Sequence, residues 1–504
     1  MRVEDFLRDS ARRSPDKTAL VAGGRRPGYA ELDAMSDRLA AALAQRGLER
    51  GDRAIVFMDN CWEAAVAIFA VLKAGGVFSP INPSTKADKL AYVVNNCRAR
   101  AILTQARLLP VAEAAQAECP SLAVGIAVGR DFEEALACDA APPAMPGIDI
   151  DLCMLVYTSG STGFPKGVMM THRNVVAAAT SITTYLENTP DDIVLNVLPI
   201  SFDYGLYQVL MAIKVGATLV LEKSFAFPQA ILNRMAEEKV TGLPLVPTMA
   251  ALILGMKDLR PGAFPHLRYL TNTAAALPPA HIMRLQELFP ASRIYSMYGL
   301  TECKRCTYLP PAELARRPSS VGIAIPGTEA YVVDDAGNRA GPGEVGELVI
   351  RGAHVMKGYW ENPEATDKAL RSGPFPWEKV LHTGDLFRTD DDGFLYFVGR
   401  KDDIIKSRGE KVSPKEVENV LYALPGVREA AVVGMPDPIL GQAIKAVVAL
   451  EPGASLTDHD IIRHCARHLE DYMVPKTVEF RDELPKTESG KISRRLVGTW
   501  EAAA

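Results

Sequence analysis

Residues 155–172 read LVYTSGSTGFPKGVMMTH. A run of strand-forming residues enters a loop made almost wholly of Gly, Ser and Thr, a single lysine, Lys166, follows, and the apolar pattern then resumes. Glycines allow the backbone to approach a ligand closely, while hydroxyls and backbone N–H groups can hold phosphate oxygens. A flexible linker would have a similar composition, but the two apparent strands that flank the loop favour a phosphate-binding role.

The spacing of this loop differs from that of the nucleotide P-loop, G-x4-G-K-[ST]. Five residues after Gly160 stands Pro165, and five residues after Gly163 stands Val168. The pattern therefore argues against a P-loop phosphohydrolase, which would release ADP.

The segments around the loop alternate between strand and helix patterns. DRAIVFMD (52–59) and ARAILTQ (99–105) predict strands, and CWEAAVAIFAVLKAGG (61–76) predicts a helix closed by glycine. The same rhythm returns over residues 192–248. Such alternation is typical of βαβ units and mostly parallel sheets.

The pattern changes near Val321. Residues 321–352 place Gly and turn pairs between β-branched residues, and a further hairpin pattern ends at Arg400. The remaining residues have an α+β pattern of their own. We therefore predict an α/β fold with a large N-terminal domain of βαβ-type sheets, a small β-barrel-like subdomain and a small α+β C-terminal domain that begins near residues 400–402.

Composition sets further bounds. A chain of 504 residues exceeds the size of one hydrophobic core, and a net charge of −5 gives no sign of a nucleic-acid partner. No uncharged apolar stretch reaches the roughly 18 residues of a membrane span, and the N-terminus is too polar for a signal peptide. Eight scattered cysteines fit a reducing compartment, so we expect a soluble cytoplasmic protein. Cys303 and Cys306 have CxxC spacing but no second pair, which favours a structural role over a metal or redox site.

Five motifs follow one another along the chain. They are YTSGSTGFPKG (157–167), YSMYGLTE (295–302), LHTGDL (381–386), VGRKDDIIKSRGEKVSPKEVE (398–418) and PKTESGKISR (485–494). This ordered set resembles the signatures of the adenylate-forming superfamily, which includes acyl-CoA synthetases, luciferases and nonribosomal-peptide adenylation domains. The resemblance extends over essentially the whole chain.

The resemblance implies a two-step reaction that uses ATP and Mg²⁺. A carboxylate attacks the α-phosphorus of ATP and gives an acyl-adenylate and pyrophosphate, and a thiol then displaces AMP and gives a thioester. Cations and Mg²⁺ must neutralise charge while it redistributes in the in-line transfer. No covalent protein nucleophile is needed, which agrees with the lack of a Ser-His-Asp or Cys-His pattern.

Roles follow from the resemblance. The β- and γ-phosphates are assigned to Thr158, Ser159, Gly160, Ser161, Thr162, Gly163 and Lys166. Thr301 is assigned to the α-phosphate, and Glu302 to Mg²⁺, for which a carboxylate is an apt ligand. Tyr298, with Gly299, is assigned to adenine. Relatives have a Gly-Gly-Ala-Pro stretch near the base, whereas this chain has NTAAALPP (272–279), in which Thr273 and Ala274 occupy the usual glycine positions. Small residues there leave room for the base, and Ala274 and Ala275 are assigned to the nucleotide.

The resemblance also assigns the ribose and the mobile domain. Asp385 is expected to accept hydrogen bonds from both ribose hydroxyls, with Arg400 beside it. Asp402 matches the hinge of the small domain, so the predicted division is residues 1–398, a hinge at 399–402 and a mobile domain at 403–504. Lys491 matches the lysine that bridges the attacking carboxylate and the α-phosphate.

The predicted activity is that of an AMP-forming acyl-CoA synthetase, with a phosphopantetheinyl acyl carrier protein as the alternative acceptor to coenzyme A. YGLTE and EKVSPKEVE resemble acyl-CoA synthetases, whereas HRN, KSRG and DYMVPK (471–476) resemble carrier-charging domains. Some CoA ligases have a basic residue near Met473 or Val474, and this chain has none at those two positions.

The small carboxylic acid is expected to meet Phe202, Asp203, Asn272 and Lys304. In amino-acid-activating relatives an aspartate at the position of Asp203 pairs with the substrate ammonium group. The alternative, which we favour, is that Asp203 caps the helix that begins near Tyr204. Lys304 would suit an acid with an extra anionic or polar group if it faced the pocket, but we expect it to be exposed to solvent.

Overall fold

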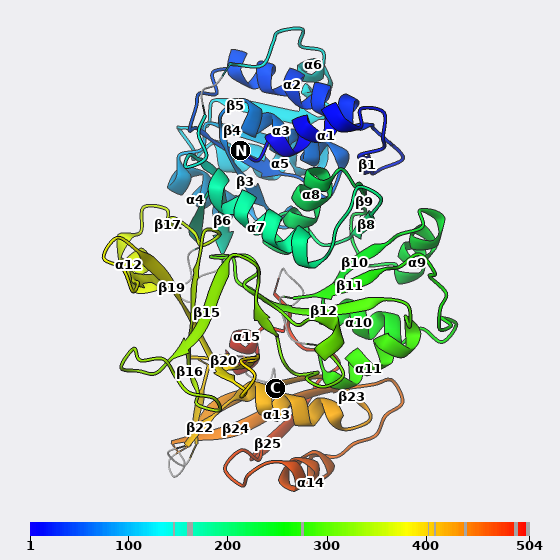
Figure 1. The fold of residues 1–504 in the computed structure, drawn as a ribbon, viewed down its shortest axis with the longest axis vertical. Coiled ribbons are helices and arrows are strands. Elements are labelled where there is room, and N and C mark those ends of the chain that lie inside the picture. Colours follow the sequence, from blue (N-terminus) through cyan, green and yellow to red (C-terminus); the bar gives the residue numbers. More distant parts are fainter. Residues whose placement is uncertain are drawn as a thin grey trace.

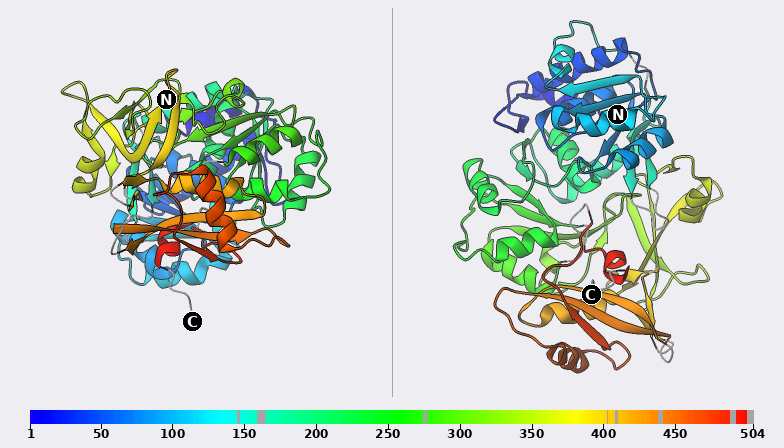
Figure 2. Two further views of the ribbon diagram at one scale, coloured as in Figure 1. Left: turned by 90° about the horizontal axis from the view of Figure 1, so that it is seen from below. Right: turned by 180° about the vertical axis from the view of Figure 1, so that it is seen from behind.

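The computed structural model describes residues 1–144, 147–158, 165–273, 277–401, 403–407, 410–437, 441–487 and 492–499. In these ranges the strands form four sheets, and helices cover the first two (Figures 1 and 2). The α/β class with a small C-terminal domain, predicted from the sequence, is confirmed.

The first sheet has the strand order β17-β7-β6-β3-β2-β4-β5. Strands β2 to β6 run parallel, whereas β7 is antiparallel to both β6 and β17. Its strands are β2 (Arg53–Phe57), β3 (Val77–Ile81), β4 (Ala101–Gln105), β5 (Val124–Val128), β6 (Leu152–Thr158), β7 (Lys166–Thr171) and β17 (Gly358–Tyr359). The helices in this half are α1 (Asp5–Arg13), α2 (Tyr29–Gln45), α3 (Trp62–Lys73), α4 (Ala87–Cys97), α5 (Leu109–Gln116) and α6 (Phe132–Leu136), with a 3-10 turn at Ala106–Leu108.

Alternation along β2 explains why both faces of this sheet are covered. Ala54 and Val56 belong to the core cluster that contains α2 and α3, whereas Ile55 and Phe57 belong to the cluster under α4 and α5. Helix α3 is apolar on all sides and is buried from Ala64 to Lys73.

The second sheet has the order β1-β9-β8-β10-β11-β12-β13-β14. Strands β8 to β12 are parallel, so the carboxyl ends of β10, β11 and β12 lie at one edge. Its strands are β1 (Leu20–Val21), β8 (Ile193–Asn196), β9 (Thr218–Leu221), β10 (Gly242–Leu245), β11 (Tyr269–Asn272), β12 (Arg293–Tyr298), β13 (Thr307–Tyr308) and β14 (Ile323–Ala324). The accompanying helices are α7 (His172–Tyr185), α8 (Asp203–Val215), α9 (Pro228–Glu237), α10 (Pro247–Leu254) and α11 (Pro279–Leu288), with a 3-10 turn at Pro311–Glu313. Ligands of parallel α/β sheets bind beyond such carboxyl edges.

The third sheet is antiparallel and corresponds to the predicted barrel-like subdomain. Its strands are β15 (Thr328–Val333), β16 (Gly346–Gly352), β18 (Leu370–Ser372), β19 (Lys379–Thr389) and β20 (Leu395–Arg400), with α12 (Pro363–Ala369) beside them. One core cluster runs from Val3 to Leu395 and joins the first three sheets.

The fourth sheet lies at the opposite end of the molecule from β2–β5 (Figure 1). Its strands are β21 (Ile405–Ser407), β22 (Glu410–Val412), β23 (Val427–Asp437), β24 (Gly441–Leu450) and β25 (Thr477–Phe480), and its helices are α13 (Pro414–Ala423), α14 (Asp458–His468) and α15 (Arg494–Thr499). Its two core clusters contain no residue before Ile405. Within the described part of the chain, no helix has the length and apolarity needed to cross a membrane.

Candidate functional site

The Gly/Ser/Thr loop connects the antiparallel strands β6 and β7, as the flanking patterns predicted. Thr158 and Lys166 face each other in the register of this pair, so both ends of the loop are fixed by the sheet. Residues 159–164, which include the predicted phosphate contacts Ser159 to Gly163, lie outside the described residues.

Tyr359 connects Lys166 with Glu302. Its hydroxyl donates a 2.7 Å hydrogen bond to Oε1 of Glu302, and its ring centre lies 5.6 Å from Nζ of Lys166. The position of Tyr359 is set by its pairing with Val168 of β7, and the backbone N–H of Met356 donates to the carbonyl of Glu302 at 2.7 Å. The loop lysine and the predicted metal ligand therefore meet through a residue that the sequence analysis did not identify.

The segment after β12 folds back tightly on itself. A Cβ on Gly299 would lie 1.7 Å from the carbonyl oxygen of Lys304, so no other residue fits there without displacement. The N–H of Lys304 donates to the carbonyl of Leu300 at 2.6 Å, and the φ of Lys304 is 67°. Gly299 is thus required by the shape of this turn, which carries Thr301 and Glu302 at the carboxyl end of β12.

Asp385 is held between Tyr298 and Arg400. The Tyr298 hydroxyl donates to Oδ2 of Asp385 at 2.5 Å, and Nε of Arg400 lies 3.3 Å from Oδ1. Asp385 and Arg400 are register partners on β19 and β20, while the Tyr298 ring packs edge-on against Phe387 at 4.8 Å. The structure therefore brings together three of the residues that were assigned to the nucleoside.

Burial dominates the electrostatics of this cluster. It raises the pKa of Asp385 above its ordinary value, against the opposing effects of Arg400 and the Tyr298 hydrogen bond. Burial, together with the charge of Asp385, also raises the pKa of Tyr298. The phenol consequently keeps its proton and acts as the donor.

Two expectations about the acid pocket are wrong. Lys304 is not exposed to solvent: it is 1% exposed, because the tight turn directs it inward. Asp203 is not the cap of α8: the helix begins at Asp203 itself, and the N-cap residue is Phe202, which provides no side-chain cap. Asp203 in the first turn still interacts favourably with the helix dipole. Asn272 ends β11 as a buried residue beside Ser296 of β12.

Several predicted residues lie outside the described ranges. They are the adenine residues Ala274 and Ala275, the hinge residue Asp402 and the catalytic residue Lys491. The CxxC cysteines, in contrast, are described. Cys303 and Cys306 are both buried and free, and no group of three or more metal-ligating side chains occurs among the described residues.

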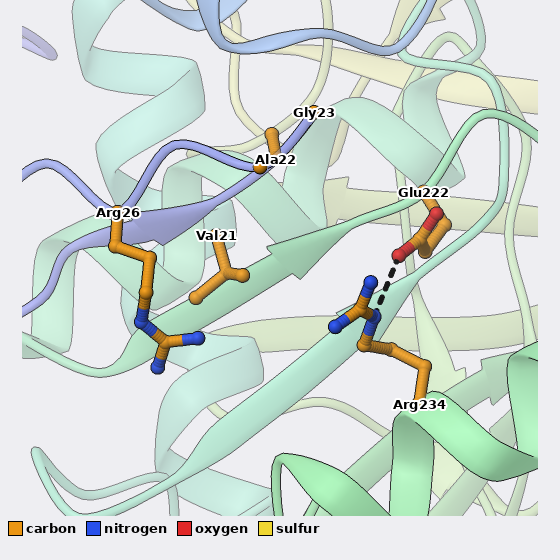
Figure 3. Close-up of a pocket in the computed structure, with 7 residues that line it drawn as sticks. Val21, Ala22, Gly23, Arg26, Glu222 and Arg234 are labelled. Atoms are coloured by element: carbon orange, nitrogen blue, oxygen red, sulfur yellow. Dashed lines mark hydrogen bonds and ion pairs between the residues drawn. The ribbon is translucent and has the colours of Figure 1, made fainter.

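A small cavity of about 180 Å³ lies elsewhere, at the β1 side of the second sheet (Figure 3). Glu222 and Arg234 form an ion pair there at 3.1 Å, and Arg26 pairs with Glu238 at 2.7 Å. None of the predicted site residues lines this cavity.

The chain is similar to known proteins over almost its whole length. Residues 7–360 match the family model "AMP-binding enzyme" and residues 416–491 match "AMP-binding enzyme C-terminal domain". The chain is 36% identical to a feruloyl-CoA synthase of Amycolatopsis sp, over 96% of this chain and 95% of that protein. It is 32% identical to a long-chain-fatty-acid–CoA ligase of Bacillus subtilis, over 98% and 93%. The crystal structure of ATP-bound MatB from Rhodopseudomonas palustris has a TM-score of 0.90 and 29% identity, over 99% and 98%.

The fold and the family matches therefore define the class of the protein as an AMP-binding enzyme. The chain belongs to the AMP-binding enzyme family, within the adenylate-forming superfamily that its motifs resembled. The predicted enzyme class, AMP-forming acyl-CoA ligase, is confirmed at the level of this family.

Proposed function

We propose that this chain is an ATP-dependent carboxylate–thiol ligase that forms an acyl-adenylate and pyrophosphate and then transfers the acyl group to coenzyme A. The observation that carries this proposal is the convergence of three groups around the end of β12: Glu302 with Tyr359, Lys166 beside the same tyrosine, and the Tyr298–Asp385 pair. These groups supply a cation from β7, a carboxylate from the turn after β12, and a buried hydrogen-bond acceptor from β19.

Different residues would bind the ribose, the leaving pyrophosphate and the α-phosphate of ATP. Asp385 has an acceptor oxygen for a ribose hydroxyl while its other oxygen accepts from Tyr298. Lys166, with the residues of the 159–164 loop, would neutralise the leaving pyrophosphate. Thr301 would contact the α-phosphate.

Mg²⁺ is implied by the family, and the donor set fits it. The described residues offer no cluster of three ligating side chains, and Mg²⁺ is commonly held by one or two carboxylates together with substrate phosphates and water. Glu302 is the carboxylate in place, and the Tyr359 hydrogen bond fixes its orientation. The ion would neutralise charge on the phosphates.

The small domain would supply Lys491 for adenylation and would turn at Asp402 between the two half-reactions, with residues 1–398 and 403–504 as the two bodies. The separate core clusters of residues 405–497 support this division, because such a unit can move as a body. The hydroxyl of Ser413 donates to the Val398 carbonyl across the proposed boundary.

The test is acid-dependent pyrophosphate exchange across a library of small carboxylic acids, followed by acceptor assays. We expect exchange that requires both an acid and Mg²⁺, release of AMP, and a thioester with coenzyme A. Release of ADP would contradict the proposal. Transfer to a phosphopantetheinyl acyl carrier protein but not to coenzyme A would replace the acceptor and leave the adenylation step intact.

A further inference from the structure

Two consecutive cations, Lys304 and Arg305, are buried between β12 and helix α8, and each is 1% exposed. The guanidinium carbon of Arg305 lies 4.6 Å from the ring centre of Tyr204 and 5.7 Å from that of Tyr207. Nζ of Lys304 lies 5.9 Å from the Tyr207 ring centre. Both tyrosines belong to α8, which begins with the predicted pocket residue Asp203.

These cations have no anionic partner among the described residues. Nζ of Lys304 and all three side-chain nitrogens of Arg305 lack a hydrogen-bond partner. Burial lowers the pKa of Lys304, and the charges of Asp203 and Glu302, which act at longer range, only partly oppose that lowering. Tyr207, whose ring both cations approach, has a buried hydroxyl that also lacks a hydrogen-bond partner among the described residues.

Lys73 and Arg268, two other cations of the described residues, are paired with carboxylates. Nζ of Lys73 lies 2.5 Å from Asp33 and 2.8 Å from Asp37. The half-buried Arg268 also stacks on a tyrosine, Tyr269, at 4.7 Å, but it lies 2.8 Å from the carboxylate of Asp192. The Lys304–Arg305 pair therefore differs from these cations in lacking a carboxylate.

A buried charge without a partner is costly, and a cation–π contact recovers only part of the lost hydration. Lys304 carries a second cost, because its φ of 67° lies in the left-handed region that non-glycine residues rarely occupy. An apolar pair would fill this space at lower cost. An anion that arrives with the substrate would satisfy both cations at once.

We propose that Lys304 and Arg305 form a subsite for a second carboxylate of the acid, so that this chain activates dicarboxylic acids. The inference rests on the proposed function, because it requires that the acid binds between Glu302 and α8. The planar guanidinium fork matches the two oxygens of a carboxylate, and Lys304 adds a second charge-assisted contact. The carboxylate that reacts would face the α-phosphate, and the distal one would face Arg305.

The experiment compares α,ω-dicarboxylic acids of increasing length with monocarboxylic acids of the same length and with their monoamides. Initial rates of pyrophosphate exchange give kcat/KM for each acid. We expect the wild-type protein to prefer one dicarboxylic acid over its monocarboxylic partner. In Arg305→Met this preference should fall by about 10–10²-fold, because one partner of a buried charge-assisted interaction is lost.

Arg268→Met is the matched control. It removes an arginine that also stacks on a tyrosine, but it leaves Asp192 buried without its partner, so it should lower the melting temperature and affect all acids equally. Arg305→Met should not lower the melting temperature of the ligand-free protein, because it removes an unpaired charge. Arg305→Lys, which keeps the charge but loses the fork, provides a second variant with an intermediate preference.

Each result decides the inference. Activation of monocarboxylic acids with no preference for any dicarboxylic acid would overturn the subsite and leave the proposed function standing. Equal losses for both kinds of acid in Arg305→Met and Arg305→Lys would assign Arg305 a structural role and also overturn the subsite. Failure of the wild-type protein to activate any acid would overturn the proposed function itself.

Discussion

The hydroxyl of Tyr298 donates a 2.5 Å hydrogen bond to Oδ2 of Asp385, 87 positions further along the chain. This contact joins the end of a parallel strand of the second sheet to a strand of the antiparallel third sheet. The proposed nucleoside site is therefore composed of residues from two sheets that share one core.

Asp385→Asn should weaken ATP binding without destabilising the protein at neutral pH. Burial raises the pKa of Asp385, so the folded state binds its proton more tightly than the unfolded state. The free energy of unfolding therefore falls as pH rises from the ordinary carboxyl pKa to the raised pKa of the folded protein. Above the raised pKa, Asp385 is charged and the folded protein bears the whole free-energy cost of burying that charge. Asn removes this cost but loses a charged acceptor, so KM for ATP should rise by about 10–10²-fold.

Melting temperatures of Asp385→Asn and the wild-type protein from acid to neutral pH check this account. The melting temperature of the variant should rise relative to that of the wild type as pH rises, and this difference should disappear in acid. A variant that is equally destabilised at every pH would show that the carboxylate is structural.

Tyr359→Phe should raise the Mg²⁺ concentration that supports half-maximal activity, with a loss of about 3–10-fold in kcat/KM. The phenyl ring keeps the packing beside Lys166, whereas Glu302 loses the hydroxyl that orients it. A Mg²⁺ titration of pyrophosphate exchange measures the effect. Tyr396→Phe is the control, because its hydroxyl also donates to a carboxylate, that of Asp390, but on the β19–β20 hairpin away from Glu302.

Much of this arrangement could be predicted from local patterns. The strand expected at 52–59 is β2, and the helix expected at 61–76 is α3, with ends a few residues shorter. The ends of elements were predicted less accurately. Helix α8 begins one residue earlier than predicted, so Asp203 lies in its first turn and not at its N-cap. Hydrophobic period and glycine identify an element, but its end depends on tertiary contacts.

Contacts between distant segments could not be predicted in the same way. Tyr359 lies in the segment VMKGYW (355–360), which matches none of the motifs identified in the sequence. Its hydrogen-bond partner Glu302 is 57 positions away in the sequence. The burial of Lys304 depends on a turn that only the close approach at Gly299 permits. Because a charged side chain next to a motif is ordinarily exposed, the sequence alone predicted that Lys304 is exposed to solvent.

Lys491→Ala should abolish adenylate formation and spare thioester formation from a supplied acyl-adenylate. A lysine that bridges the attacking carboxylate and the α-phosphate is needed only while these two anions approach each other. Loss of such a contact costs about 10²–10³-fold in rate. Pyrophosphate exchange reports the first step, and thioester yield from synthetic acyl-adenylate reports the second. Equal losses in both steps of a folded variant would show that Lys491 has another role.

Asp203→Ala separates a role of Asp203 in the first turn of α8 from a contact with a substrate amine. Asp203 is the first residue of α8, where its charge interacts favourably with the helix dipole by about 0.3–1 kcal/mol. Burial lowers the pKa of Lys304, and the charge of Asp203 partly opposes that lowering. Two cations in the same region would repel a substrate ammonium group. We therefore expect a small loss of stability and equal effects on paired acids that differ only by an α-amino group, measured by pyrophosphate exchange and thermal unfolding. A selective loss for the amino acid by about 2–3 kcal/mol would instead identify Asp203 as the partner of a substrate amine, because that ammonium would lose its buried counter-charge.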